Sequence, residues 1–440
     1  MTSVHDLTAM RPEEVWLWAC ARAWPRRPDP VDPASLDWTV VVDLAIRNRM
    51  QVLIERVLVG SGLRDALPSG PSDALRAAVQ TYARSARDMT GLLQRYLPMA
   101  RDRGIESAVF KGMHLCEKVY RDPEIRPGMD IDLLVRRHQV RDSVVLLEEL
   151  GLGRFWPSLL EDAYYDRHHL HQQRCTPEHR IWVDIHWALD HPYNCLTIDY
   201  DALMDRTRES TLVGAPVREL SASDDLLCLV VHLVKHAVYL PGVLSRPDLA
   251  RIILADGFLM YFVDIATLLQ THAAEIDWPE TWRRARAWGA TVSLDASLRV
   301  CRDCLATPMP ADAVATHVPA GSGVVTRWFM DRLATQKRLE LEGRRPGVVA
   351  SFLFGYNQAL VLRPVRLLDL SSFLLPSAEY LERRYGFSSI VQLARHTGGV
   401  LVSACRFVLD TVYYTLKRQL RPNRHAPAPD GSGSHEASAP

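Results

Sequence analysis

The sequence predicts an α/β (α+β) fold, in which a small mixed sheet is flanked by helical regions on both sides. Short apolar runs with period-two spacing alternate with helical segments between residues 104 and 200. In residues 1–103 and 201–420, apolar side chains recur mainly at the spacing of amphipathic helices. Residues 421–440 contain too few apolar side chains to order themselves, so we expect a disordered tail.

Composition narrows the class of protein. The chain has 440 residues, with 52 basic and 52 acidic side chains and a net charge of zero. Without a global positive field, a nucleic acid partner is not expected. The longest apolar stretch, residues 348–375, is interrupted by Arg363, Arg366 and Asp369, so no membrane span is predicted. The N-terminus lacks the pattern of a signal peptide and the eight cysteines are scattered, so we expect a cytoplasmic protein.

The N-terminal region reads as helices. Apolar residues at helical spacing predict helices over residues 13–23 and within 37–58. Ser72 could cap a long helix that runs to about Arg103 and ends at Gly104.

The central segment alternates strands with helices. We expect strands at residues 107–110, 130–135, 168–174 and 180–189, and helices at 113–120 and 140–150.

The C-terminal region is predicted to be helical again, with a Pro- and Gly-rich linker at residues 310–325. The expected helices are 225–240, 258–272, 278–289, one through Arg299, 328–341, 376–385 and 400–420.

Two aspartates begin the second expected strand, in the segment RPGMDIDLLV. Asp130 and Asp132 are two residues apart, so in a strand both carboxylates lie on the same face. Two carboxylates held together repel each other unless a cation lies between them, and oxygen ligands suit Mg²⁺. The alternative is that both residues cap a loop at the edge of a strand.

A third carboxylate lies in RIWVDIHWAL. Alternation places Asp184 and His186 on one face and the apolar Val183 and Ile185 on the other. A charge in mid-strand among apolar residues needs a metal ion or a basic partner. A salt bridge to an arginine is therefore the alternative to a metal site.

Upstream, the segment VFKGMHL ends a predicted strand at Lys111. Gly112 lets the backbone approach a ligand closely, and the free N–H groups of the following helix could face a phosphate. The ammonium group of Lys111 could contact phosphate oxygens.

These pieces together resemble the uncharacterised bacterial nucleotidyltransferase family of the DNA polymerase beta-type nucleotidyltransferase superfamily. The matching segments are FKGMHLCEKVYRDPEIRPGMDIDLLV, HHL at 168–170 and VDIHWAL at 183–189, and the resemblance extends over most of the chain. Most members of the wider superfamily have Gly-Ser where this chain has Gly112-Met113, and Asp130 follows Gly112 by eighteen residues. The resemblance therefore leaves open how a triphosphate is held.

The resemblance implies a metal-dependent enzyme that moves a nucleotidyl group from an NTP to an acceptor. Asp130 and Asp132 would hold Mg²⁺ or Mn²⁺, and Asp184 would complete a second metal site and help to deprotonate an acceptor hydroxyl. The acceptor could be a small molecule, a sugar phosphate, a peptide or a protein. Phosphate-binding residues would be Lys111, Gly112 and Arg126, although Arg126 could instead pair with Asp184.

Two other functions fit the same residues. The fold could serve as a non-catalytic binding module or scaffold in a biosynthetic pathway, or the donor could be something other than a nucleotide. Retention of Asp130, Asp132 and Asp184 favours the enzyme, because an unused carboxylate cluster is costly to keep. His186 could contact substrate or fix the Asp184 carboxylate.

The remaining candidates are histidines and cysteines. A zinc site is conceivable at the histidine-rich strand but is less expected, because alternation splits its side chains between two faces. The other pairs are interpreted as packed or cleft-lining side chains. The histidine-rich strand contains His168, His169 and His171. The other pairs are His232 and His236 in one helix and Cys301 and Cys304 in another.

Overall fold

The computed structural model describes residues 10–126, 128, 130–154, 169–178, 180–190, 196–237, 240, 244 and 246–313, with isolated positions between 390 and 409. The helices predicted at 328–341 and 376–385, most of the linker and the C-terminal tail lie outside the described residues. The helix predicted at 400–420 is described only at Leu409.

Within the described residues, the strands form a six-stranded mixed sheet in the order β3-β4-β2-β1-β6-β5. β2 is antiparallel to β1 and parallel to β4, so the centre of the sheet mixes both kinds of pairing. The strands are β1 (Ser107–Phe110), β2 (Asp130–Val135), β3 (His171–Cys175), β4 (Trp182–His186), β5 (Arg208–Leu212) and β6 (Ala215–Glu219).

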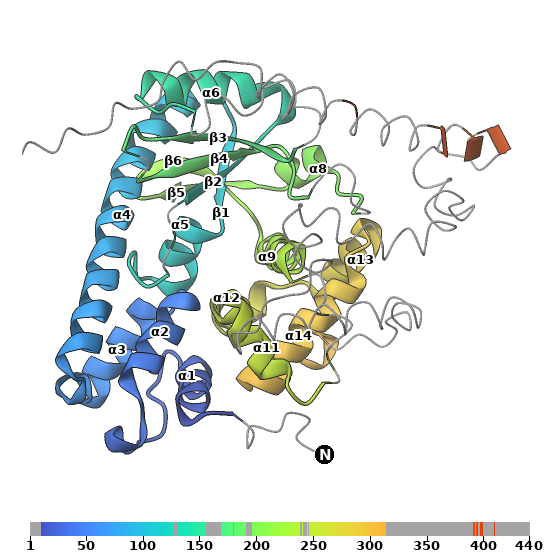
Figure 1. Ribbon diagram of the computed structural model, residues 1–440. Coiled ribbons are helices and arrows are strands. Elements are labelled where there is room, and N and C mark those ends of the chain that lie inside the picture. Colours follow the sequence, from blue (N-terminus) through green and yellow to red (C-terminus); the bar gives the residue numbers. More distant parts are fainter. Residues whose placement is uncertain are drawn as a thin grey trace, which may run out of the picture.

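Helices precede and follow the sheet, which confirms the predicted fold class. The long helix α4 runs along one side of the molecule, from α2 and α3 to the sheet (Figure 1). The first group is α1 (Pro12–Ala23), α2 (Trp38–Arg47), α3 (Gln51–Ser61) and α4 (Ser69–Asp102), with 3₁₀ turns η2 (Pro33–Ser35) and η3 (Arg64–Ala66).

Within and after the sheet segment, α6 covers one side of the sheet while α5 and α9 lie on the other (Figure 1). The helices are α5 (Gly112–Leu115), the π-helical η4 (Cys116–Tyr120), η5 (Arg137–Gln139), α6 (Val140–Glu149), α8 (Tyr200–Asp205), α9 (Ala222–His236), α11 (Leu249–Asp256), α12 (Leu259–Thr271), η6 (Ala273–Glu275), α13 (Trp278–Trp288), α14 (Thr291–Leu305) and η7 (Ala311–Ala313).

The start of α4 differs from the sequence prediction. Ser72 lies inside the first turn, and its hydroxyl accepts a hydrogen bond from Nη1 of Arg64 at 2.8 Å rather than capping the helix. The helix begins three residues earlier, after Pro68. Pro71 fits this first turn because the first N–H groups of a helix have no intrahelical partner to lose. At its other end, Gly104 takes the expected positive φ of 68°.

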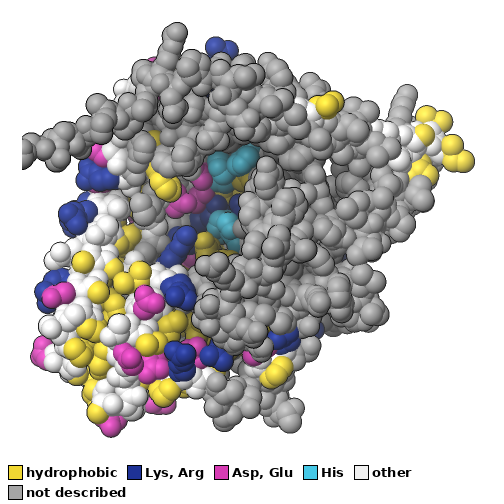
Figure 2. Space-filling view, viewed as in Figure 1, with side chains coloured by type: hydrophobic (Ala, Val, Ile, Leu, Met, Phe, Trp, Pro, Cys, Tyr) yellow, Lys and Arg dark blue, Asp and Glu magenta, His cyan; other side chains and the backbone are white. Residues whose placement is uncertain are grey.

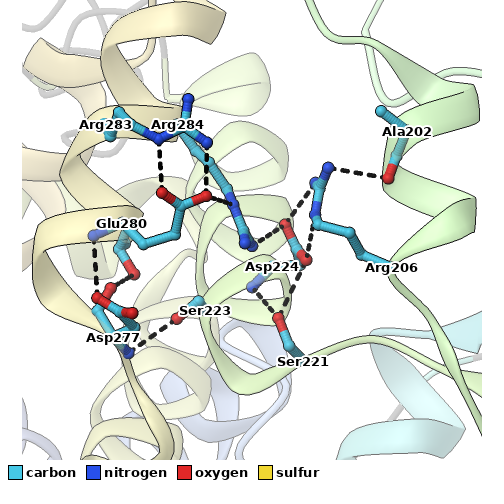
Figure 3. A network of polar contacts seen from close by, with 10 residues as sticks. Ala202, Arg206, Ser221, Ser223, Asp224, Asp277, Glu280, Arg283 and Arg284 are labelled. Atoms are coloured by element: carbon cyan, nitrogen blue, oxygen red, sulfur yellow. Dashed lines mark hydrogen bonds and ion pairs between the residues drawn. The ribbon is translucent and has the colours of Figure 1, made fainter.

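A buried carboxylate fixes the start of α9. Asp224 is fully buried, and its oxygens lie 2.9 Å from Nη2 of Arg206, after α8, and 2.9 Å from Nη1 of Arg284, on α13 (Figure 3). Ser221 caps the helix by accepting from the Asp224 N–H at 3.1 Å. This network holds α8, α9 and α13 together and thereby sets where α9 lies beneath the sheet.

Asn48 joins the N-terminal helices to α11 and α12. Its side-chain Nδ2 donates to the Leu254 carbonyl at 3.0 Å, and its Oδ1 accepts from the Leu259 N–H at 3.1 Å. The residue is fully buried. The two helical regions are therefore tied by hydrogen bonds between residues more than 200 positions apart.

Among the described residues, no single helix has the length and apolar character needed to cross a membrane. The helices α11 and α12 meet that test only when taken together, and they are bent by 107° relative to each other.

Candidate functional site

The sheet brings the three predicted aspartates together. Asp132 on β2 lies opposite Asp184 on the neighbouring parallel strand β4, and Asp130 is two residues before Asp132. Alternation directs all three side chains to one face of the sheet. One carboxylate oxygen from each residue lies within 4.8 Å of the other two.

Asp132 is the carboxylate whose negative charge is already stabilised by neighbouring protein groups. Its Oδ1 lies 2.7 Å from Nζ of Lys111 and 2.9 Å from Nε2 of His186. Burial alone would raise the pKa of Asp132, but these two partners outweigh it and hold the pKa far below its ordinary value. Asp132 is therefore a fixed negative charge at the centre of the site.

Asp184 is in the opposite situation. Its Oδ1 accepts a hydrogen bond from Nε2 of Gln173 at 2.8 Å, and the nearest cationic candidate is Nε2 of His171, 3.8 Å from Oδ2. Burial and the neighbouring Asp132 raise the pKa of Asp184 to about 7. No arginine pairs with Asp184 among the residues that the structure describes, so the salt-bridge interpretation of this residue is wrong there.

Asp130 adds a third acidic group. Burial and Asp132 raise the pKa of its carboxyl group. Two of the three carboxyl groups are thus held in surroundings that oppose their charge, and all three offer oxygen atoms from one face. This donor set fits a hard divalent cation such as Mg²⁺, whose charge would offset the repulsion among them.

Lys111 has an unusual backbone conformation at the end of β1. Its φ of 57° and ψ of −140° lie in a region that residues other than glycine rarely occupy. The conformation accompanies the contact of the buried ammonium group with Asp132. Next to it, a Cβ atom on Gly112 would lie 3.7 Å from the Asp130 carbonyl oxygen, so the Lys-Gly turn packs directly against the aspartate strand.

Arg126 pairs with Asp264 on α12, not with Asp184 as the sequence allowed. Its Nε lies 2.9 Å from Asp264 Oδ2, and the Tyr120 hydroxyl donates to Oδ1 of the same carboxylate at 2.8 Å. Both members of the pair are buried. The second branch of the guanidinium group faces the aspartates, because a Cβ on Gly128 would lie 3.6 Å from Arg126 Nη1 and 3.5 Å from Asp130 Oδ1.

A wall of two histidines and one lysine on α9 lies across from the aspartates; the sequence analysis interpreted the histidines as packed or cleft-lining side chains and missed the lysine. His232, Lys235 and His236 share one helix face by their spacing of three and four residues. The Lys235 ammonium group has no hydrogen bond or ion pair among the described residues. Burial and Lys111 lower the pKa of Lys235 to about 8. Figure 2 shows histidine, basic and acidic side chains gathered in a recess on this side of the molecule.

The segment HLVKH carried a signal that could have identified this wall, because one face of an apolar helix has three groups that bind anions or protons. Nothing in the sequence placed that face opposite Asp132 and Asp184, whose charges act on Lys235. Rings of His232 and His236 pack 5.3 and 6.2 Å from that of Tyr261.

The remaining candidates divide between core and site. Cys301 and Cys304 are buried on α14, and burial raises the pKa of both thiols, which agrees with their interpretation as packed side chains. His168 lies outside the described residues. His169 and His171 are described, with ring centroids 4.7 Å apart.

Comparison with known proteins places the chain in a family. A family model described as "Uncharacterised nucleotidyltransferase" matches residues 34–306, which is more than half of the chain. Every candidate residue named above lies within this range. No curated protein and no solved structure matches the chain. On the strength of the family match, the chain belongs to the uncharacterised nucleotidyltransferase family.

Proposed function

We propose that this member of the nucleotidyltransferase family transfers a nucleotidyl group from an NTP to a hydroxyl or phosphate of a small molecule, peptide or protein, with Mg²⁺ or Mn²⁺ as cofactor. The observation that carries the proposal is the convergence of Asp130, Asp132 and Asp184 on one face of adjacent strands. A carboxylate cluster of this kind has a clear use in phosphoryl chemistry and is expensive to keep without one.

The three aspartates would hold the metal ions. When bound, the ions would stabilise the negative charge on the attacking and leaving oxygens of an in-line displacement. Asp132, which stays ionised, would bridge the site, with Asp130 and Asp184 on either side of it. His186 is best assigned a positioning role, because its Nε2 contacts Asp132 and not Asp184.

Asp184 would accept the proton of the acceptor hydroxyl at Oδ2. Its Oδ1 is engaged by Gln173, while Oδ2 has no partner within hydrogen-bond distance among the described residues. Without metal the pKa of Asp184 is about 7, and bound cations would lower it, which would keep the carboxylate ionised and able to accept a proton at neutral pH.

Positive groups around the aspartates would bind the phosphates of the donor. Lys111, the backbone of Gly112 and the second branch of the Arg126 guanidinium group lie on the sheet side, and Lys235 reaches the same space from α9. Buried cations are normally paired, so the ammonium of Lys235, which has no partner among the residues that the structure describes, favours an anionic ligand. A triphosphate between Lys111 and Lys235 would relieve their mutual repulsion.

A thermal-shift screen tests the donor site. The full chain is heated with each of the four NTPs, with and without Mg²⁺, beside the Asp130→Asn/Asp132→Asn variant. We expect a Mg²⁺-dependent rise in melting temperature with at least one NTP, absent in the variant, because a ligand that binds the folded state stabilises it. No shift with any NTP at millimolar concentration would contradict the proposal and favour a binding module or another donor.

Transfer itself is tested with labelled donors. With an NTP labelled at the α-phosphate, the label should move to an acceptor in a fractionated extract, and pyrophosphate should be released. Movement of a γ-phosphate label instead would identify phosphoryl transfer and reject nucleotidyl transfer.

A further inference from the structure

Imidazole rings line the sheet beside the three aspartates. His171 on β3 lies directly opposite His186 on β4 in the antiparallel register, so both side chains project from the same face. Their ring centroids are 4.8 Å apart. Asp184, two residues before His186, lies on this face as well.

The orientation of His186 is set by its backbone contact. Its Nδ1 lies 3.1 Å from the Ala188 carbonyl oxygen, which can only accept, so Nδ1 carries the hydrogen. The other ring nitrogen, Nε2, lies 2.9 Å from Asp132 Oδ1 and is the atom that faces the aspartates. Histidines that bind metals typically donate their second N–H to a backbone carbonyl in this way.

The side chain of His171 has no hydrogen bond among the described residues. Within them its Nδ1 is buried without a partner, and its Nε2 lies 3.8 Å from Asp184 Oδ2, beyond hydrogen-bond distance. Two ligands about 2.1 Å from a tetrahedral ion lie roughly 3.4 Å from each other. A small rotation of the His171 ring would bring its nitrogen to that separation from Asp184.

We propose that His171, Asp184 and His186 form a binding site for a divalent transition metal that prefers imidazole, such as Zn²⁺ or Fe²⁺. One ligand atom from each residue already lies within 4.8 Å of the others. Two nitrogen ligands and one oxygen ligand favour such ions over Mg²⁺, which binds oxygen. Three protein ligands leave a coordination position open, as in catalytic rather than structural sites.

This site shares Asp184 with the three-aspartate site. Its part in a reaction therefore rests on the proposed function, whereas the site itself rests on the contacts of His171 and His186.

Metal titration tests the site. The metal-stripped full chain is titrated with Co²⁺ in excess Mg²⁺, and visible absorption reports nitrogen coordination; Zn²⁺ is then added to displace the Co²⁺. We expect one Co²⁺ per chain in the wild type and at least tenfold weaker binding in His171→Gln and His186→Gln. The matched control is His138→Gln, an exposed histidine on η5, which should bind as the wild type does.

Equal Co²⁺ affinity in the wild type and in His171→Gln would overturn the proposal. If His186→Gln does not fold, the comparison with His171→Gln is the deciding test. The same preparations are then heated with Mg²⁺ and NTP. Stabilisation by NTP without a histidine-dependent Co²⁺ site removes the transition-metal proposal alone. A histidine-dependent Co²⁺ site in a wild type that binds no NTP supports the metal site and contradicts the proposed function alone.

Discussion

Asp132 and Asp184 lie opposite each other in the sheet, yet their surroundings drive their protonation in opposite directions. Lys111 and His186 keep Asp132 ionised, whereas burial and the charge of Asp132 raise the pKa of Asp184 to about 7. One carboxylate thus stays ionised while the other can hold or release a proton near neutral pH. Division of roles between paired carboxylates by environment is a common route to acid–base chemistry.

The pKa of Asp184 predicts how stability depends on pH without metal. Its folded value of about 7 lies above an unfolded value of roughly 3.9. The stabilisation from protonated Asp184 is therefore complete below about pH 4 and is lost as the pH rises through about 7. Because Asp184→Asn mimics the protonated form, its melting temperature should exceed that of the wild type at pH 8 by at least about 2 °C, and by less at pH 5.

The measurement is thermal unfolding in a chelator at pH 5 and pH 8. Asp43→Asn, at an exposed position on α2, is the control and should show no such divergence. A difference in melting temperature between Asp184→Asn and the wild type that stays constant from pH 5 to pH 8 would contradict the raised pKa of Asp184.

Lys235 offers a second test at the residue scale. Lys235→Met removes an unpaired cation from the cleft, so we expect unchanged or higher stability without ligand. The same change should weaken Mg²⁺–NTP binding by roughly tenfold, about the effect of one charge-assisted contact. Thermal unfolding and nucleotide titration measure the two effects. Lys118→Met, which loses a contact to Glu219 outside the site, should leave NTP affinity unaltered.

Among the elements, α9 has its position fixed by its buried N-terminal aspartate. Asp224→Ala leaves Arg206 and Arg284 without their shared partner, so unfolding free energy should fall by about 3–5 kcal/mol. Denaturant titration measures the loss. Arg283→Ala, which removes an exposed pair with Glu280, should change stability by less than about 1 kcal/mol. Similar losses in the two variants would show that Asp224 does not anchor α9.

The strands show what the sequence could predict. β1 and β2 have the predicted bounds, because their side chains are almost all buried and apolar apart from the aspartates. The hairpin β5–β6 was not predicted. β5 is an edge strand whose residues are mostly polar and exposed, so it lacks the apolar alternation of a half-buried strand. Its turn has Val213 at a φ of 49°, and valine is not a turn signal.

The hairpin also bears on the proposed division of the chain. Through β6, which pairs with β1, the sheet extends to Glu219, past the boundary expected at residue 200. That division remains a prediction from composition and periodicity.

The same limit applies to the site. Asp130, Asp132 and Asp184 were found because alternation along each strand is a local property. The partner of Arg126 could not be found, because Asp264 is 138 residues away on α12. Lys235 was missed as a site residue, and a metal site at His171 was considered but less expected, for this reason too: only the packing of α9 and the pairing of β3 bring these residues to the aspartates.

At the scale of the whole molecule, the two helical regions are interlocked. Asn48 hydrogen-bonds to both α11 and the start of α12, and the Trp18 indole donates to the Ala250 carbonyl at 3.3 Å. The N-terminal helices and the pair α11 and α12 are therefore held together by hydrogen bonds between distant parts of the chain. We expect the N-terminal helices to unfold together with the C-terminal ones.

Asn48→Ala tests this coupling. It leaves buried backbone groups at Leu254 and Leu259 without partners, so the unfolding free energy should fall by about 2–4 kcal/mol. Fluorescence and circular dichroism should still report one coincident transition. Two separate transitions in the wild type would mean that the regions fold independently. Asn48→Asp keeps the acceptor for the Leu259 N–H but removes the donor to the Leu254 carbonyl. A smaller loss of unfolding free energy than in Asn48→Ala would mean that the donor contact contributes little.

The central claim is that the three aspartates bind an NTP through a divalent metal. It is tested most directly by calorimetric titration of the full chain with an NTP whose α,β-bridge cannot be cleaved, with Mg²⁺ or with chelator. We predict one nucleotide per chain in Mg²⁺, and no measurable binding in chelator or in Asp132→Asn. Binding that is equally tight without metal, or that survives loss of Asp132, would contradict the account.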